Sequence, residues 1–126
     1  MKLNHINIRA DIVTLEVVKD FYCDVLGFEI GDRPKLSISG YWLYSEGAAL
    51  IHLQSSNETL ALHSDSYLDH VAFEGDDLQS TISRLNAQNI DFGSNYIESF
   101  NLTQLFFLDP VGNKIEINFA GEQLTI

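Results

Sequence analysis

The sequence predicts an α+β fold built from two βαβββ modules in tandem. Two segments open alike, with Leu-Asn-His-Ile at 3–6 and Leu-Asp-His-Val at 68–71. Each opening leads into an alternating strand pattern, then a helical pattern, then three more strand-like runs. We therefore expect one domain over residues 1–126, with an internal repeat of 1–54 and 67–120.

The first module begins with a strand over residues 2–9, where apolar and polar side chains alternate. Asp11 can cap a following helix, and Gly27 can end it. The apolar face of this helix should consist of Leu15, Val18, Tyr22 and Val25. Further strands are expected at 28–33, 41–46 and 48–54, with Glu46-Gly47 turning between the last two.

The second module repeats this plan after a polar connection at 54–66. A strand is expected at 68–74, and Asp76 or Asp77 can cap a helix whose apolar face holds Leu78, Ile82 and Leu85. Strands should follow at 91–97, 102–108 and 113–119, with an Asp-Pro-Val-Gly turn at 109–112. One helix covers one face of each sheet, so the other face is left for a partner or a cavity.

Composition excludes several classes of protein. The net charge is −11 and the seven Lys and Arg residues are scattered, which argues against nucleic acid as a partner. Cys23 is the only cysteine, so we expect neither a disulfide nor a zinc–thiolate site, and we interpret it as a small buried helix residue. No apolar run approaches a membrane span of about 20 residues. The start of the chain lacks signal-peptide features, so we expect a cytoplasmic protein.

Four side chains share the face opposite the large apolar residues of their strands: His5, His52, His70 and Glu116. The repeat makes His5 equivalent to His70, and nearly equal spacing makes His52 equivalent to Glu116. A lone strand histidine is usually only hydrogen-bonded or solvated, and His63 in the connection is interpreted that way. The repeat-related set instead predicts one divalent metal ion, which could be Fe, Zn, Ni or Mn.

The stretches LNHINIRA, FYCDVLGFEI, LDHVAF and FFLDPVGNKIEINF resemble the vicinal-oxygen-chelate superfamily. This superfamily includes glyoxalase I, extradiol dioxygenases, and fosfomycin- and bleomycin-resistance proteins. The resemblance implies a cup-shaped mixed sheet around a metal, with helices on the outer face, and a homodimer. It also implies His5, His70 and Glu116 as metal ligands. Arg9 matches the arginine with which glyoxalase I holds the glutathione carboxylate, a rim salt bridge being the alternative.

His52 departs from the resemblance, because glyoxalase I has a Glu at that position. Glu116 is then the only carboxylate that could act as a base, which disfavours activity on a glutathione hemithioacetal. A fosfomycin transferase is disfavoured because no Arg or Lys follows Glu116. His5, His70 and Glu116 could hold the Fe(II) of an extradiol dioxygenase. Against this, extradiol dioxygenases commonly have two such metal-binding modules in one chain. His52 as a fourth ligand would also occupy a coordination site that oxygen needs.

Aromatic residues provide a candidate wall for a substrate pocket. Alternation places Trp42 and Tyr44 on one face and Tyr41 on the other. We predict that Trp42 and Tyr44 contact substrate, with core or dimer-interface packing as the alternative.

The function expected from the sequence is that of a glyoxalase/dioxygenase-like metalloenzyme. It would act on a small oxygen-chelating substrate by isomerase, lyase or dioxygenase chemistry, with the ion as Lewis acid. His52 would be a fourth ligand or an acid/base, Glu116 could serve in catalysis, and Arg9 would orient an anionic group. The alternative is a metal-free, bleomycin-resistance-like protein that sequesters a ligand. A purely structural or regulatory module has no support in the sequence.

Overall fold

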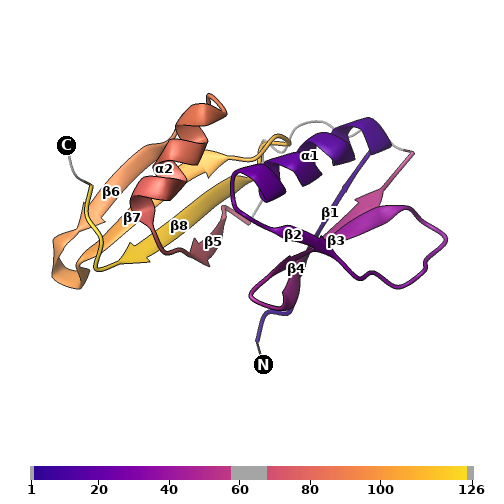
Figure 1. The fold of residues 1–126 in the computed structure, drawn as a ribbon, viewed down its shortest axis with the longest axis horizontal. Helices are drawn as coiled ribbons and strands as arrows, with labels where there is room; N and C mark the ends of the chain where they lie inside the picture. The colour runs from indigo at the N-terminus through magenta and orange to yellow at the C-terminus, as the bar shows by residue number, and fades with distance from the viewer. Residues whose placement is uncertain (1, 58–67, 125–126) are drawn as a thin grey trace. The chain divides into compact units, whose positions relative to one another are not determined.

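A computed structural model describes residues 2–57 and 68–124 (Figure 1). The chain divides into two compact units, Met1–Ala61 and Leu62–Ile126. Both units have the element order βαβββ, which confirms the predicted α+β fold with tandem modules. A single domain and a cup formed jointly by both sheets stay predictions. His63 lies outside the described residues.

The first unit contains β1 (Ile6–Ala10), α1 (Ile12–Asp24), β2 (Glu29–Gly31), β3 (Gly40–Ser45) and β4 (Ala48–Ser55). Its four-stranded sheet has the order β1-β4-β3-β2, with β1 parallel to β4 and the other pairs antiparallel. The predicted cap of α1 is confirmed, because the Asp11 carboxylate accepts a hydrogen bond from the Thr14 backbone N–H at 2.9 Å. The predicted turn is also confirmed, since Glu46 and Gly47 both have positive φ, at 51° and 79°.

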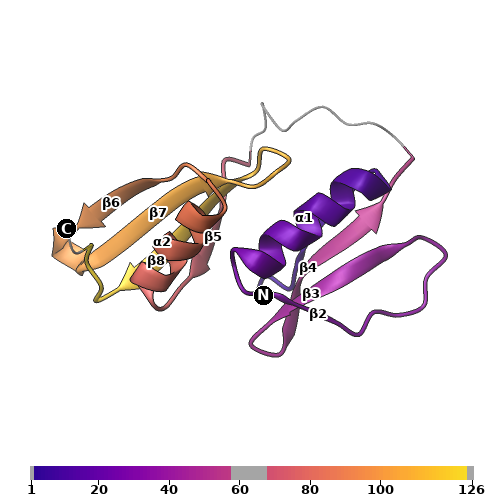
Figure 2. The same ribbon diagram turned by 45° about the horizontal axis from the view of Figure 1, so that its top comes forward.

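Helix α1 covers one face of this sheet (Figure 2). Its four predicted apolar positions are all buried: Leu15, Val18, Tyr22 and Val25. Burial of each Leu or Val side chain contributes roughly 1.5–3 kcal/mol relative to exposure. On β4, Ile51 and Leu53 are buried while the alternating His52 is only half-buried. The predicted alternation of faces is therefore confirmed on this strand.

The second unit contains β5 (Val71–Glu74), α2 (Leu78–Ala87), β6 (Gly93–Ile97), the 3₁₀ turn η1 (Glu98–Phe100), β7 (Leu102–Leu108) and β8 (Lys114–Ala120). Its strand order, β5-β8-β7-β6, repeats that of the first unit. Asp77 is the cap of α2, accepting from the Ser80 backbone N–H at 3.0 Å, and Glu122 accepts from the Leu78 backbone N–H at 2.8 Å.

The core face of α2 differs in one position from the expectation. Leu78 and Leu85 are buried as predicted, but Ile82 is only half-buried. Thr81 takes a buried position instead, at 3% exposed, and its hydroxyl donates to the Asp77 carbonyl. Such a hydrogen bond satisfies the polar atom, so a threonine can occupy an apolar face.

The β7–β8 hairpin is held by the buried carboxylate of Asp109. It accepts hydrogen bonds from the Val111 backbone N–H at 3.0 Å, the Asn113 backbone N–H at 2.8 Å and the Asn113 side-chain amide at 2.9 Å. The turn predicted at 109–112 is thereby confirmed. It brings β8 back beside β7 with Phe106 opposite Glu116, so the turn helps to place a predicted ligand.

Several strand bounds differ from the sequence-based expectation. The strands expected at 2–9 and 68–74 begin only at Ile6 and Val71, where their pairing with β4 and β8 begins. The strand expected at 28–33 is the short edge strand β2. Cys23 lies on α1 and is half-buried, and burial raises the pKa of its thiol. Among the described residues, no helix is both long and apolar enough to cross a membrane.

Candidate metal centre

The second unit brings His70 and Glu116 together. Glu116 is paired in register with Ala72, two residues after His70, and Nε2 of His70 lies 3.6 Å from Oε1 of Glu116. Two ligands of one tetrahedral ion, each about 2.1 Å from it, are about 3.4 Å apart. The observed separation therefore fits a pair of ligands on one ion. Asn118 orients the carboxylate, because its side-chain amide donates to Oε2 at 2.9 Å.

The other ring nitrogen of His70 contacts a carboxylate. Nδ1 lies 2.8 Å from Oδ2 of Asp69, and the same oxygen accepts a hydrogen bond from Nζ of Lys114 at 3.1 Å. The hydrogen bond to His70, followed by that to Lys114, lowers the pKa of Asp69 below its ordinary value. Asp69 is therefore a carboxylate at neutral pH. Since Nδ1 contacts Asp69, the nitrogen of His70 that faces Glu116 is Nε2.

The first unit brings His5 and His52 together in a different way. Asn7 is the register partner of His52, so His52 occupies the strand position that Glu116 occupies in the second unit. The rings of His5 and His52 are stacked, with centroids 3.8 Å apart and planes 9° from parallel. Trp42 stacks on the other face of His52, with centroids 4.0 Å apart and planes 12° from parallel. His52 is thus the middle ring of three.

This stack does not direct its two histidines to one point. The lone pair of an imidazole nitrogen lies in the ring plane, so parallel rings have lone pairs in separate parallel planes. A ring must turn before His5 and His52 can bind the same ion. Burial lowers the pKa of His52 below its ordinary value, and the neighbouring His5 lowers it further. His52 is therefore neutral at pH 7, with one nitrogen able to accept a proton.

The predicted ligands thus occur as one pair in each unit. Within residues 2–57 and 68–124, no group of three or more His, Cys, Asp or Glu side chains is arranged to hold a metal ion. The combination of all four ligands around one ion stays a prediction. The sequence patterns did not identify the polar partners of these ligands, which are Asn4, Asp69 and Asn118, nor Lys114, which contacts Asp69. One signal was present, since an Asn or Asp directly precedes the histidine in both repeats.

Arg9 lies at the far end of the same face of β1, paired in register with Gln54. It lines a pocket of about 400 Å³, together with Gln54 and several hydroxyl groups: Ser37, Ser39, Ser55 and Ser56. A guanidinium among hydroxyl groups offers donors for a negatively charged oxygen. This environment suits the anion-binding role predicted for Arg9.

The three aromatic residues of β3 lie as alternation predicts. Tyr41 faces α1, where its hydroxyl donates to Glu16. The Tyr44 ring covers Gly31, the register partner of Trp42, which puts Tyr44 and Trp42 on the same face.

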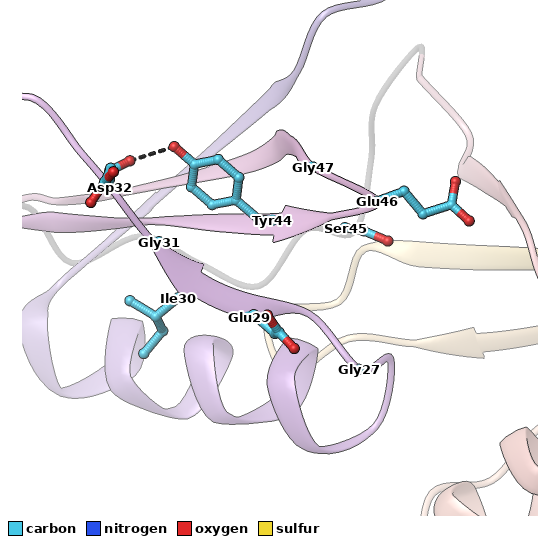
Figure 3. Close-up of a pocket in the computed structure, with 9 residues that line it drawn as sticks. All are labelled: Gly27, Glu29, Ile30, Gly31, Asp32, Tyr44, Ser45, Glu46 and Gly47. Atoms are coloured by element: carbon cyan, nitrogen blue, oxygen red, sulfur yellow. Dashed lines mark hydrogen bonds between the residues drawn. The ribbon is translucent and has the colours of Figure 1, made fainter.

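Tyr44 nevertheless belongs to a pocket of its own (Figure 3). This pocket of about 500 Å³ lies between β2 and the β3–β4 turn, and the Tyr44 hydroxyl donates to the Asp32 carbonyl at 2.6 Å. Its lining includes the carboxylates of Glu29, Asp32 and Glu46 and none of the four predicted ligands.

Comparison with known proteins gives a family match. A family model described as Glyoxalase/Bleomycin resistance protein/Dioxygenase superfamily matches residues 2–117. No curated protein shows a significant match.

Solved structures share the fold at low sequence identity. A putative glyoxalase family protein from Bacillus anthracis is 20% identical, with 95% of each chain covered and a TM-score of 0.73. A lactoylglutathione lyase from Agrobacterium tumefaciens is 20% identical over 94% of this chain and 92% of that one, with a TM-score of 0.65. A mutant of the fosfomycin resistance protein FosX from Listeria monocytogenes, complexed with Mn(II) and 1S,2S-dihydroxypropylphosphonic acid, is 15% identical over 98% and 94%, with a TM-score of 0.68.

Proposed function

The chain belongs to the Glyoxalase/Bleomycin resistance protein/Dioxygenase superfamily, and from this membership we propose that it is a metal-dependent enzyme acting on a small, oxygen-chelating substrate. The membership confirms the resemblance to vicinal-oxygen-chelate proteins. The observation that carries the proposal is the His70–Glu116 pair, whose 3.6 Å separation suits two ligands of one ion. His5, the repeat equivalent of His70, is the proposed third ligand.

Two imidazoles and one carboxylate are a donor set that suits Fe(II), Mn, Zn or Ni. The Mn(II) complex of FosX, a protein of the same fold, supports a divalent ion of this kind. Such an ion, when bound, supplies Lewis-acid polarisation of a substrate oxygen. The choice between isomerase, lyase and dioxygenase chemistry follows from which metal the protein carries.

His52 is proposed as the acid/base beside the ion rather than as a ligand. Both faces of its ring are covered, by His5 and Trp42, which fixes its plane and leaves only its edge exposed to a substrate. Its lowered pKa keeps it neutral at pH 7, so it can accept a proton from a carbon or oxygen next to the reacting group. The carboxylate of Glu116 is the alternative base that could accept the same proton.

Arg9 is proposed to bind an anionic group of the substrate. Its pocket is on the His52 side of the sheet, since Arg9 and Asn7 share a face of β1 and Asn7 donates to Gln54 at 3.2 Å. A homodimer is also proposed, because each helix covers only one face of its sheet. The molar mass of the protein in solution tests the dimer.

The metal content of protein purified without chelators or a metal-affinity step tests the proposal. About one divalent ion per chain is expected, and His5→Ala and Glu116→Ala should each lower that content. His52→Gln should retain the metal and lose turnover, which separates an acid/base from a ligand. Unchanged metal content in both His5→Ala and Glu116→Ala would refute the metal centre. Iron would favour dioxygenase chemistry, and nickel or zinc would favour isomerase or lyase chemistry.

A second candidate function is metal-free sequestration of a ligand. The stack of His5, His52 and Trp42 favours it, because a planar group can extend such a stack by lying against the outer face of one of its end rings. The net charge of −11 suits a cationic ligand. Substoichiometric metal, together with quenching of Trp42 fluorescence by a cationic planar drug such as bleomycin, would favour this candidate over the enzyme.

A further inference from the structure

We infer that Asp69 is a positioning residue that holds His70 in one tautomer, with Nε2 unprotonated and turned toward Glu116. The inference rests on the proposed function in one respect, since it takes His70 and Glu116 as ligands of the ion. It adds a residue and a role that the family match does not provide.

The contact with Asp69 determines which nitrogen of His70 carries the ring hydrogen. An ionised carboxylate has only acceptor oxygens, so its 2.8 Å contact with Nδ1 requires the proton to be on Nδ1. A neutral imidazole carries one such proton, and the lone pair is then on Nε2. That nitrogen is the one 3.6 Å from Glu116. Asp69 therefore selects the form of His70 that can bind a cation beside Glu116.

Asp69 is itself held by a hydrogen bond from Lys114. Lys114 donates to the same oxygen that contacts His70, and Lys114 is the first residue of β8, two residues before Glu116. Strand β8 thus carries both the ligand Glu116 and Lys114, which holds Asp69 beside His70. The side chains of Asp69 and Lys114 are 72% and 45% exposed, so their ion pair adds little to folding stability. Its effect is on geometry, and removing Asp69 should leave the protein folded.

The first unit has an asparagine at the position that Asp69 occupies in the second unit. There, Asn4 precedes His5 as Asp69 precedes His70, and its side-chain oxygen lies 2.7 Å from Nδ1 of His5. An amide can present either its oxygen or its NH₂ group, so it is compatible with both tautomers of His5. The two modules therefore differ at this position: Asp69 fixes the tautomer of His70, whereas Asn4 allows either tautomer of His5.

The repeat supplies a matched pair of variants, Asp69→Ala and Asn4→Ala. Two-dimensional ¹H–¹⁵N spectra of the histidine rings, recorded on metal-free protein, report which nitrogen carries the proton. We expect His70 to be protonated on Nδ1 in the wild type and to shift to the Nε2–H form in Asp69→Ala, while Asn4→Ala leaves His70 unchanged. A wild-type His70 protonated on Nε2, or an unchanged tautomer in Asp69→Ala, would overturn the inference.

Zinc affinity, measured by competition with a chelator, provides the second readout. Asp69→Ala should weaken zinc binding about 10- to 100-fold, and Asn4→Ala should weaken it less, because an amide is compatible with either tautomer of His5. If the wild type binds zinc and both variants bind it equally well, the inference is wrong while the proposed function stands. If the wild type binds no zinc, the proposed metal centre is wrong, and the ring spectra alone decide the role of Asp69.

Discussion

Replacement of Asp109 by alanine should destabilise the protein by about 2–4 kcal/mol. The carboxylate is 4% exposed and accepts three hydrogen bonds, from the backbone N–H groups of Val111 and Asn113 and from the Asn113 side chain. A hydrogen bond to a charged group contributes about 1.5–3 kcal/mol, but the three bonds are part-buried and water can replace Asp109 as the acceptor in the variant, so about 1 kcal/mol each is appropriate. Alanine supplies no acceptor for any of the three donors.

Urea unfolding at pH 7 measures this change, provided the slope of the free energy against urea stays the same in wild type and variant. Asp109→Asn is the control, because its remaining oxygen can still accept the two backbone bonds while its NH₂ group faces that of Asn113. It should cost about 1 kcal/mol. Equal stability of wild type and Asp109→Ala would refute the assignment of Asp109 as the group that holds the hairpin. Metal binding through Glu116, which follows the turn, should weaken in parallel with the loss of stability.

Three further predictions use other parts of the structure. Because burial and His5 lower the pKa of His52 below its ordinary value of 6.5, the unfolded chain takes up this proton at higher pH than the folded one. In metal-free protein the free energy of unfolding should therefore fall as the pH drops below 6.5. Protonation of His52 should quench the fluorescence of Trp42, the only tryptophan, with a midpoint pH below 6.5. A midpoint at or above 6.5 would contradict the burial of His52. Gly40→Ala should lower the free energy of unfolding by about 1–3 kcal/mol, because the new Cβ would lie 2.0 Å from a backbone oxygen of β4. Gly31→Ala should cost less in the same urea assay, since its Cβ would meet a tyrosine ring that can turn, and the reverse order would contradict this reasoning. Glu122→Ala should cost about 1 kcal/mol by removing the acceptor for the first backbone N–H of α2, and an unchanged urea midpoint would show that water replaces it.

Local sequence patterns predicted most of the fold, because the elements follow local rules. The strand expected at 102–108 matches β7, and the caps and turns were placed by side chains that bond to their own neighbourhood, as at Asp11 and Asp109. The residues at which β1 and β5 begin, Ile6 and Val71, were not predictable in this way. Residues 2–5 alternate like a strand, but a strand also needs a hydrogen-bonded neighbour, and β4 offers one only from Ile6 onward.

The sequence predicted on which face of its strand each candidate side chain lies, but not which of these side chains contact one another. Alternation placed His5 and His52 on one face and grouped Trp42 with Tyr44 on a face of their own strand. The stacking of Trp42 on His52 depends on the register of β3 and β4, in which Trp42 lies opposite His52. The hydrogen bond from Lys114 to Asp69 likewise depends on β5 and β8 being neighbours. Register and rotamer are tertiary properties, which periodicity alone does not carry.

The equivalent strand positions of His52 and Glu116 have a consequence for the charge of the proposed centre. A carboxylate at both positions would cancel the charge of a divalent ion, whereas a neutral imidazole at His52 leaves one positive charge uncancelled. That residual charge would strengthen attraction for an anionic substrate oxygen and would disfavour release of an anionic product. A single substitution, His52→Glu, would therefore shift the balance from capture of an anionic substrate toward release of an anionic product.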